Sequence, residues 1–242
     1  MLHGWAMHSG LFAPIAARLA ERFRVLLVDL PGHGRSAPLA PYTLEALAAA
    51  VAEAVRRAGG EPPLTVLGWS LGGAVALQWA ASEPGPVARL VLVATTPCFV
   101  ARTDWPGAMS AATLRKFGDE LSVSYRLTLQ RFVALQAAGG DEPREALAAL
   151  RSQLFVRGEP SPATLREALA CLEAIDLRSR VAAIAQPATV IAGERDVLVP
   201  PAASAWLART LPRASFHLLR RSAHAPFLSH PQAFLAALDD EH

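Results

Sequence analysis

A serine flanked by glycines lies in the segment Gly68-Trp69-Ser70-Leu71-Gly72. The apolar, β-branched residues 64–68 predict a buried strand before the serine, and the helical periodicity of residues 71–82 predicts a helix after it. Glycines let the turn between these two elements be tight, because they carry no side chain. This context favours a nucleophilic serine with an exposed hydroxyl. The alternative is a glycine-rich turn that holds an incidental serine.

A serine hydroxyl is a weak nucleophile near neutral pH and needs a base. Among the seven histidines we select His224, which lies between an expected strand at 215–219 and an expected helix at 231–240. Loops that follow parallel strands lie along one edge of a sheet, and Ser70 is expected on the same edge. His230 is the alternative base. Three further histidines are weaker candidates for the base: His8 lies at a predicted helix start, His217 lies within a predicted strand, and His242 is the last residue.

A carboxylate that orients the base is expected in the loop after residues 187–193, which we interpret as a strand. There Asp196 would accept a hydrogen bond from the second ring nitrogen of His224, fix its tautomer and stabilise the imidazolium. Glu194 is the nearest alternative, and its other role is a solvated surface charge. The order Ser70, Asp196, His224 predicts nucleophilic catalysis through an acyl-enzyme.

The negative charge that forms on the substrate oxygen needs two fixed hydrogen-bond donors. We expect one to be the backbone N–H of Leu71, directly after the serine. The other is expected from the loop His3-Gly4-Trp5, and we select the N–H of Trp5. The alternative for Trp5 is a packing role, and His3 is expected to shape the loop. The loop 29–36 belongs to the same edge, but no G-K-[ST] follows it, which argues against a phosphate cradle.

The elements that must position these residues alternate along most of the chain. Before residue 98, short apolar runs and helix-period segments predict strands at 24–29, 64–68 and 89–94 and helices at about 10–22, 43–58 and 71–82. After residue 180, the same alternation predicts strands at 187–193 and 215–219 and helices at 201–210 and 231–240. This pattern predicts an α/β fold with a mostly parallel sheet flanked by helices.

No strand-like run occurs from about residue 98 to residue 180. Four segments there read as helices: about 110–121, 123–138, 142–156 and 162–174. Residues 98–180 are therefore predicted to be a helical lid inserted into an α/β core formed by residues 1–97 and 181–242.

Composition narrows the class of protein. Of 242 residues, 52% are hydrophobic and only 18% are charged, which excludes a disordered chain. The 23 Lys and Arg nearly balance the 21 Asp and Glu, so no nucleic-acid partner is expected. Two cysteines, Cys98 and Cys171, make neither a disulfide framework nor a closely spaced metal-ligand pair.

The sequence has no apolar run of about 18 residues and no export signal at its start, so we expect a cytoplasmic protein without membrane contact. We also expect a monomer. The chemistry described above requires neither a metal ion nor an organic cofactor.

The motifs at His3-Gly4, 29–36, 68–73, Asp196 and His224 resemble those of the α/β-hydrolase superfamily over nearly the whole chain. Within that superfamily, four stretches look like the pimeloyl-[acyl-carrier protein] methyl ester esterases of biotin biosynthesis. They are residues 68–73, 96–107, 131–136 and 223–231.

That resemblance implies a serine carboxylesterase that cleaves the methyl ester of a pimeloyl chain carried on acyl carrier protein and releases methanol. The residues that the resemblance assigns to substrate binding are Trp5, Ser70, Leu71, Phe132, Val133, Ala134, Leu135, Gln136 and His224. The apolar side chains at 132–135 suit an acyl chain, although an apolar helix face more often belongs to the core.

The resemblance also implies that arginines of the lid receive the acidic carrier protein. The candidates are Arg126, Arg131, Arg144 and Arg151. Arginine suits carboxylate and phosphate groups. The alternative is an ordinary solvated helix face.

This chain departs from the superfamily at its start, because the His-Gly loop already begins at residue 3. Strands that normally precede this loop are expected to be missing, which would leave one sheet edge without cover. Other functions also stay open: a general short-chain ester or thioester hydrolase with the same triad, a non-catalytic ligand-binding protein, and a truncated, inactive homologue.

Overall fold

The computed structural model describes residues 1–141 and 143–239. At its centre lies a sheet of four parallel strands in the order β1-β2-β3-β4. Their bounds are Leu64–Trp69 (β1), Val87–Val93 (β2), Ala188–Gly193 (β3) and Ala214–Leu219 (β4). All six residues of β3 are buried, which explains its uninterrupted apolar sequence.

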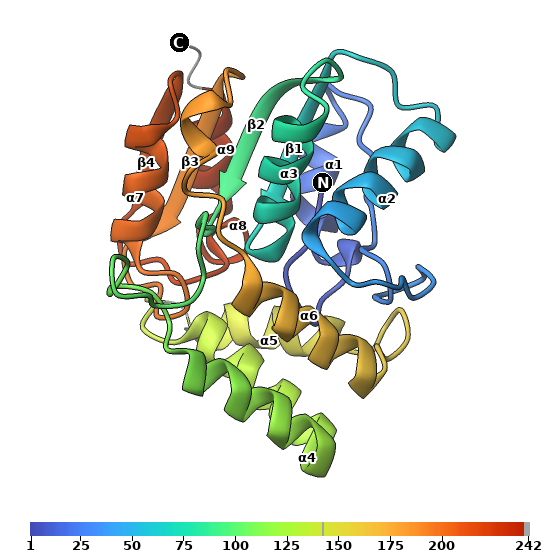
Figure 1. The fold of residues 1–242 in the computed structure, drawn as a ribbon, viewed down its shortest axis with the longest axis vertical. Helices are drawn as coiled ribbons and strands as arrows, with labels where there is room; N and C mark the ends of the chain where they lie inside the picture. The colour runs from blue at the N-terminus through green and yellow to red at the C-terminus, as the bar shows by residue number, and fades with distance from the viewer. Residues whose placement is uncertain (142, 240–242) are drawn as a thin grey trace.

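Helices cover both faces of this sheet. In Figure 1, α3 and α7 lie in front of it, and α1 and α9 lie behind it. The helices of this layer are α1 (Ala13–Leu19), α2 (Leu44–Arg57), α3 (Leu71–Ser82), α7 (Pro201–Thr210) and α9 (Pro231–Asp239). The hydroxyl of Thr43 accepts the N–H of Ala46 and so caps α2.

Three further helices lie beyond the end of the sheet to which the strands point (Figure 1). They are α4 (Ala111–Ala137), α5 (Pro143–Gln153) and α6 (Pro162–Ala174). The hydroxyls of Ser110 and Ser161 accept the N–H groups of Thr113 and Thr164 and so cap α4 and α6. The two helices expected at 110–121 and 123–138 are present within α4 and meet at a kink at Ser124, whose φ of −143° and ψ of 59° are not helical. The division of the chain into a core and a lid stays a prediction.

The strand expected at 24–29 is wrong. Leu2 pairs with Val28 on one side and with Gly68 on the other, each through a single bridge. Within the described chain, only Met1 and Leu2 pair with this segment, and two residues are too short a partner for a ladder. Residues 25–28 are half-buried.

Some helix boundaries also differ from the expectation. The helix expected at 10–22 is a 3-10 turn, Ser9–Phe12, followed by α1, which ends at Leu19. The sequence did not predict a second 3-10 turn, Val181–Ala183, or the single-turn helix α8, Pro226–Ser229. None of the described helices is long and apolar enough to cross a bilayer.

A cluster of four aromatic rings packs near the C-terminal end of β1. The ring of Phe227 lies 5.0 Å from Phe12, 5.2 Å from Trp69 and 6.1 Å from Phe234, measured between centroids. Phe227 is fully buried. This cluster packs α8 and α9 against the end of β1 and against the 3-10 turn Ser9–Phe12.

Removing the central ring should therefore unfold the protein more easily. We predict that Phe227→Ala lowers the free energy of unfolding by about 3–5 kcal/mol, because it removes a buried ring and leaves a cavity. The matched control, Phe23→Ala, removes a ring that is 52% exposed and should change it by less than about 0.5 kcal/mol. Urea unfolding measures both, and equal losses would contradict this description of the core.

Candidate active site

Ser70 lies in a strained turn between β1 and α3. Its φ of 55° is in the left-handed region, which a residue with a side chain rarely adopts. Close packing enforces the turn: a Cβ at position 68 would lie 2.3 Å from the carbonyl oxygen of Gly72, and a Cβ at position 72 would lie 2.4 Å from that of Leu2. Only glycine fits at either place, as the sequence predicted.

Hydrogen bonds fix the backbone of Ser70 and leave its hydroxyl free. Its N–H donates to the carbonyl of Val93 (2.9 Å), and its carbonyl accepts the hydroxyl of Thr95 (2.7 Å). The residue is half-buried, and its hydroxyl bonds to no residue that the structure describes. Among the described residues, this hydroxyl therefore takes no part in holding the fold.

A buried acid–base pair lies on the same edge of the sheet. Nδ1 of His224 donates to Oδ2 of Asp196 over 2.7 Å, and both side chains are almost fully buried. The other carboxylate oxygen, Oδ1, accepts the N–H groups of Leu198 and Val199, each at 2.9 Å. These three donors hold the carboxylate in place and direct Nε2 of His224 away from it.

The structure thus brings Asp196 and His224 together and places the serine turn beside them. The indole N–H of Trp69 donates to the carbonyl of His224 (2.8 Å), and the two rings lie 5.5 Å apart. No hydrogen bond joins Ser70 to His224 in the described structure. Sequence reasoning missed Trp69, and its position next to the serine was the only signal.

Two backbone donors border Ser70. The N–H of Leu71 begins α3, where the positive end of the helix dipole favours negative charge. The loop of Trp5 lies opposite, because a Cβ on the adjacent Gly4 would be 3.2 Å from that of Ser70. Neither the Leu71 nor the Trp5 N–H has an acceptor among residues 1–141 and 143–239. Both are therefore available to an incoming oxygen.

His3 shapes the Trp5 loop, as the sequence predicted. Its Nδ1 donates to the carbonyl of Gly4 (2.8 Å), and its Nε2 accepts the N–H of Leu30 (2.9 Å). Complete burial, together with the nearby His33, lowers the pKa of His3 to about 3. The ring is therefore neutral at physiological pH, which is the state that these two bonds require.

The carboxylate of Asp29 ties the neighbouring loop down. Burial disfavours its charge, but the side chain of Ser9 and the backbone N–H groups of Arg35 (3.0 Å) and Ser9 (2.7 Å) outweigh burial and lower its pKa to about 2. The loop 29–36 therefore supports the site without entering it.

Of residues 132–136, which were expected to bind substrate, two contact the site. Phe132 packs edge-on against Trp5, with centroids 4.5 Å apart, and the backbone carbonyl of Gln136 accepts the N–H of His224 (3.1 Å). Val133 is fully buried in the core, while Ala134 and Leu135 are half-buried.

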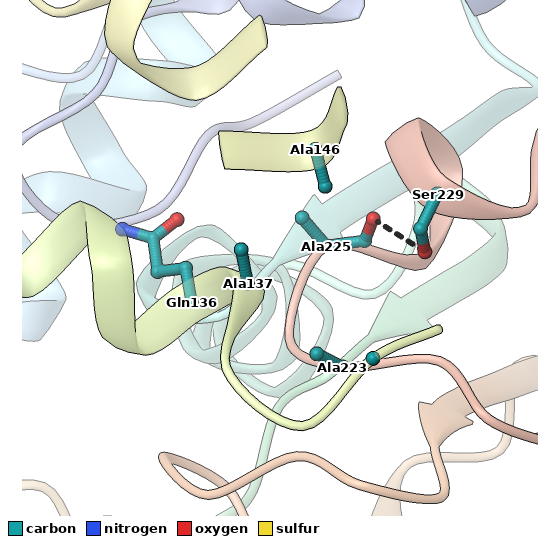
Figure 2. Close-up of a pocket in the computed structure, with 7 residues that line it drawn as sticks. Gln136, Ala137, Ala146, Ala223, Ala225 and Ser229 are labelled. Atoms are coloured by element: carbon teal, nitrogen blue, oxygen red, sulfur yellow. Dashed lines mark hydrogen bonds between the residues drawn. The ribbon is translucent and has the colours of Figure 1, made fainter. Parts of the chain in front are cut away.

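A small cavity lies beside the loop that carries His224. Figure 2 shows the side chains around it, which come from the end of α4, from α5, from the loop of His224 and from α8. Its volume of about 10 Å³ has room for one water molecule. A larger groove of about 710 Å³ runs along β1 near Met1 and Phe23, and it touches none of Ser70, Asp196 and His224.

The four arginines named from the sequence differ in their surroundings. Arg126 pairs with Glu159 and stacks 4.8 Å over the ring of Phe155. Arg131 lies 3.5 Å from Glu120. Arg144 and Arg151 are exposed on α5 and have no ion-pair partner within the described ranges.

Residues 1–231 match the family described as alpha/beta hydrolase fold. A pimeloyl-[acyl-carrier protein] methyl ester esterase of Nitrosomonas europaea is 43% identical over 239 residues, which are 99% of this chain and 93% of that protein. A protein of the same name from Xanthomonas axonopodis pv. citri is 45% identical over 98% of this chain and 92% of its own length.

Solved structures share the same fold. An esterase from Exiguobacterium antarcticum superimposes with a TM-score of 0.88 over 98% of this chain and 88% of its own, at 22% identity. A bromoperoxidase from Bacillus anthracis reaches 0.91 over 99% and 90%, at 20% identity. At such low sequence identities, these similarities establish the fold but not the reaction.

The buried histidines beneath the site predict a stability that falls in acid. Burial lowers the pKa of His33 to about 4 and that of His3 to about 3, both below the ordinary 6.5. Between pH 6.5 and 4 the unfolded chain therefore binds protons that the folded chain does not. Each group should then reduce the free energy of unfolding by up to about 1.4 kcal/mol per pH unit.

Urea unfolding at pH 7, 6 and 5 measures this slope. The variant His33→Gln should give a shallower slope than the parent chain, since it removes one of the groups whose pKa burial lowers. His3, His8 and the N-terminal ammonium contribute in both chains. Asp29 does not contribute in this window, because its pKa of about 2 places its effect below about pH 4. An identical slope in the variant would show that His33 is not held neutral.

Proposed function

This chain belongs to the alpha/beta hydrolase family and, within it, to the pimeloyl-[acyl-carrier protein] methyl ester esterases, and on that basis we propose its reaction. It is a serine carboxylesterase that hydrolyses the methyl ester of pimeloyl-acyl carrier protein to pimeloyl-acyl carrier protein and methanol, a step of biotin biosynthesis. The buried hydrogen bond between His224 and Asp196 beside the strained Ser70 is the observation that carries the proposal.

In the first half-reaction, Oγ of Ser70 attacks the ester carbonyl while Nε2 of His224 takes its proton. The carbonyl oxygen becomes negatively charged and accepts the N–H groups of Trp5 and Leu71. Asp196 stabilises the imidazolium. When the tetrahedral intermediate collapses, the imidazolium protonates the departing methoxide, which leaves as methanol, and the acyl group stays on Ser70.

In the second half-reaction, His224 removes a proton from water, and the resulting hydroxide attacks the acyl-enzyme. The same two N–H groups stabilise the second oxyanion. His224 then returns the proton to Oγ of Ser70, and the free carboxylic acid leaves. The neutral ring that accepts a proton at Nε2 in each half-reaction is the tautomer favoured by the Nδ1 bond to Asp196.

Residues 98–180 act in this proposal as a lid that receives the carrier-linked chain. Phe132 and Trp5 supply an aromatic wall for the acyl chain, with the remaining residues 133–136 behind it. Arg144 and Arg151 meet the acidic carrier protein, and Arg126 and Arg131 contribute once their own acidic partners are displaced. A monomer in the cytoplasm belongs to the same proposal.

The nucleophile is tested by one substitution. Ser70→Ala should reduce turnover of a p-nitrophenyl ester to near the uncatalysed rate, because the attacking oxygen is gone. The control Ser152→Ala changes an exposed serine and should keep full activity. A fluorophosphonate probe should label the parent chain but not Ser70→Ala. Retained turnover in Ser70→Ala would remove the proposed mechanism, and an unlabelled parent would favour a ligand-binding or inactive protein.

The carrier surface is tested by reversing charge. Arg144→Glu with Arg151→Glu should raise KM for the methyl ester on carrier protein about tenfold and leave KM for a free p-nitrophenyl ester unchanged, because only the carrier approaches α5. Arg213→Glu, on an exposed arginine without an ion-pair partner in the described chain, is the matched control.

Methanol release from pimeloyl methyl ester on carrier protein, compared with free short-chain esters, measures the preference. A chain that hydrolyses both equally well, and whose charge reversal has no effect, is a general esterase.

A further inference from the structure

Residues 136–141, which are the end of α4 and the turn after it, contact two loops: the one that carries Asp196 and the one that carries His224. We call the loop 193–199 the acid loop and the loop 220–225 the base loop. Gly139 has a φ of +86°, and a Cβ there would lie 3.2 Å from the carbonyl oxygen of Arg195 in the acid loop. A Cβ on Gly140 would lie 3.6 Å from Ala223 in the base loop. In Figure 2, Ala137 and Ala223 face the same small cavity.

One carboxylate in this turn is bonded to both loops. Oδ1 of Asp141 accepts Nη1 of Arg195 at 3.0 Å, and Oδ2 pairs with Nε of Arg221. The backbone N–H of Asp141 also donates to the carbonyl of Arg221 (3.0 Å). The same Nη1 of Arg195 also donates to the carbonyl of Gly139 (3.0 Å), so Arg195 is bonded to this turn at two points. Asp141 thereby bridges a neighbour of Asp196 and a residue of the His224 loop.

The two loops are also bonded to each other at this point. The N–H of Arg195 donates to the carbonyl of Ser222 (2.8 Å), and the N–H of Arg221 donates to the carboxylate of Glu194 (2.8 Å). Arg221 has a φ of +62°, a conformation that persists only where neighbours hold it. The bridge through Asp141 supplies part of that support from outside the two loops.

We propose that Asp141 is a positioning residue, which sets the distance between the acid loop and the base loop and so maintains the hydrogen bond from His224 to Asp196. Its role in catalysis rests on the function proposed above. Both arginines are largely exposed, so the ion pairs add little to overall stability. The ion pairs nevertheless connect the two loops whose side chains form the 2.7 Å hydrogen bond between His224 and Asp196. A small displacement of either loop would lengthen that bond.

Asp141→Asn and Asp141→Ala test this role. We expect kcat on a p-nitrophenyl ester to fall roughly tenfold with little change in KM, less than the ~100-fold that a 1 Å misplacement can cost. The melting temperature should stay close to that of the parent chain. The matched control is Asp119→Asn, an exposed acid of α4 without an ion-pair partner among the described residues, and it should leave kcat unchanged.

A spectroscopic readout separates positioning from a general structural effect. The proton between His224 and Asp196 should give a low-field ¹H resonance in the parent chain and in Asp119→Asn, and it should broaden or vanish in Asp141→Asn. Because this signal needs no substrate, it tests the positioning role even if the parent chain hydrolyses no ester, which would count against the proposed function alone. An Asp141→Asn variant with the parental resonance and kcat overturns the inference.

Discussion

The hydrogen bond from His224 to Asp196 is the interaction on which the whole site depends. A carboxylate with no access to water is costly unless donors surround it, and here a ring N–H and two backbone N–H groups satisfy it. The ring N–H reaches the carboxylate only if the loop after β3 and the loop before α8 approach one another. The elements around these two loops must therefore hold His224 and Asp196 within hydrogen-bonding distance of each other.

Ser70, the proposed nucleophile, imposes a second constraint, which acts on the backbone. Ser70 keeps its left-handed conformation because Gly68 and Gly72 allow the strand and the helix to meet with no room for a Cβ. The carbonyl of Leu2 fills the space beside Gly72, so the first residues of the chain also support the turn. The strain at Ser70 and the neutral His3 under the Trp5 loop are thus parts of one packed unit.

Local signals explain what the sequence could predict. The expected helices at 71–82 and 201–210 match α3 and α7, because a glycine turn and a proline mark their starts. The strand at 24–29 failed because strand formation depends on a partner, which the residues of the strand do not encode. The bridge from Asp141 to Arg195 and Arg221 joins residues far apart in the sequence, and no spacing rule indicates it.

The most direct test is the crystal structure of the chain after reaction with a fluorophosphonate. The account predicts a phosphorus bonded to Oγ of Ser70, with its oxygen about 2.7–3.1 Å from the N–H groups of both Trp5 and Leu71. Nε2 of His224 should lie within hydrogen-bonding distance of Oγ or of the leaving-group position, with the bond to Asp196 intact. A probe attached to another residue, or an oxygen that neither N–H reaches, would contradict it.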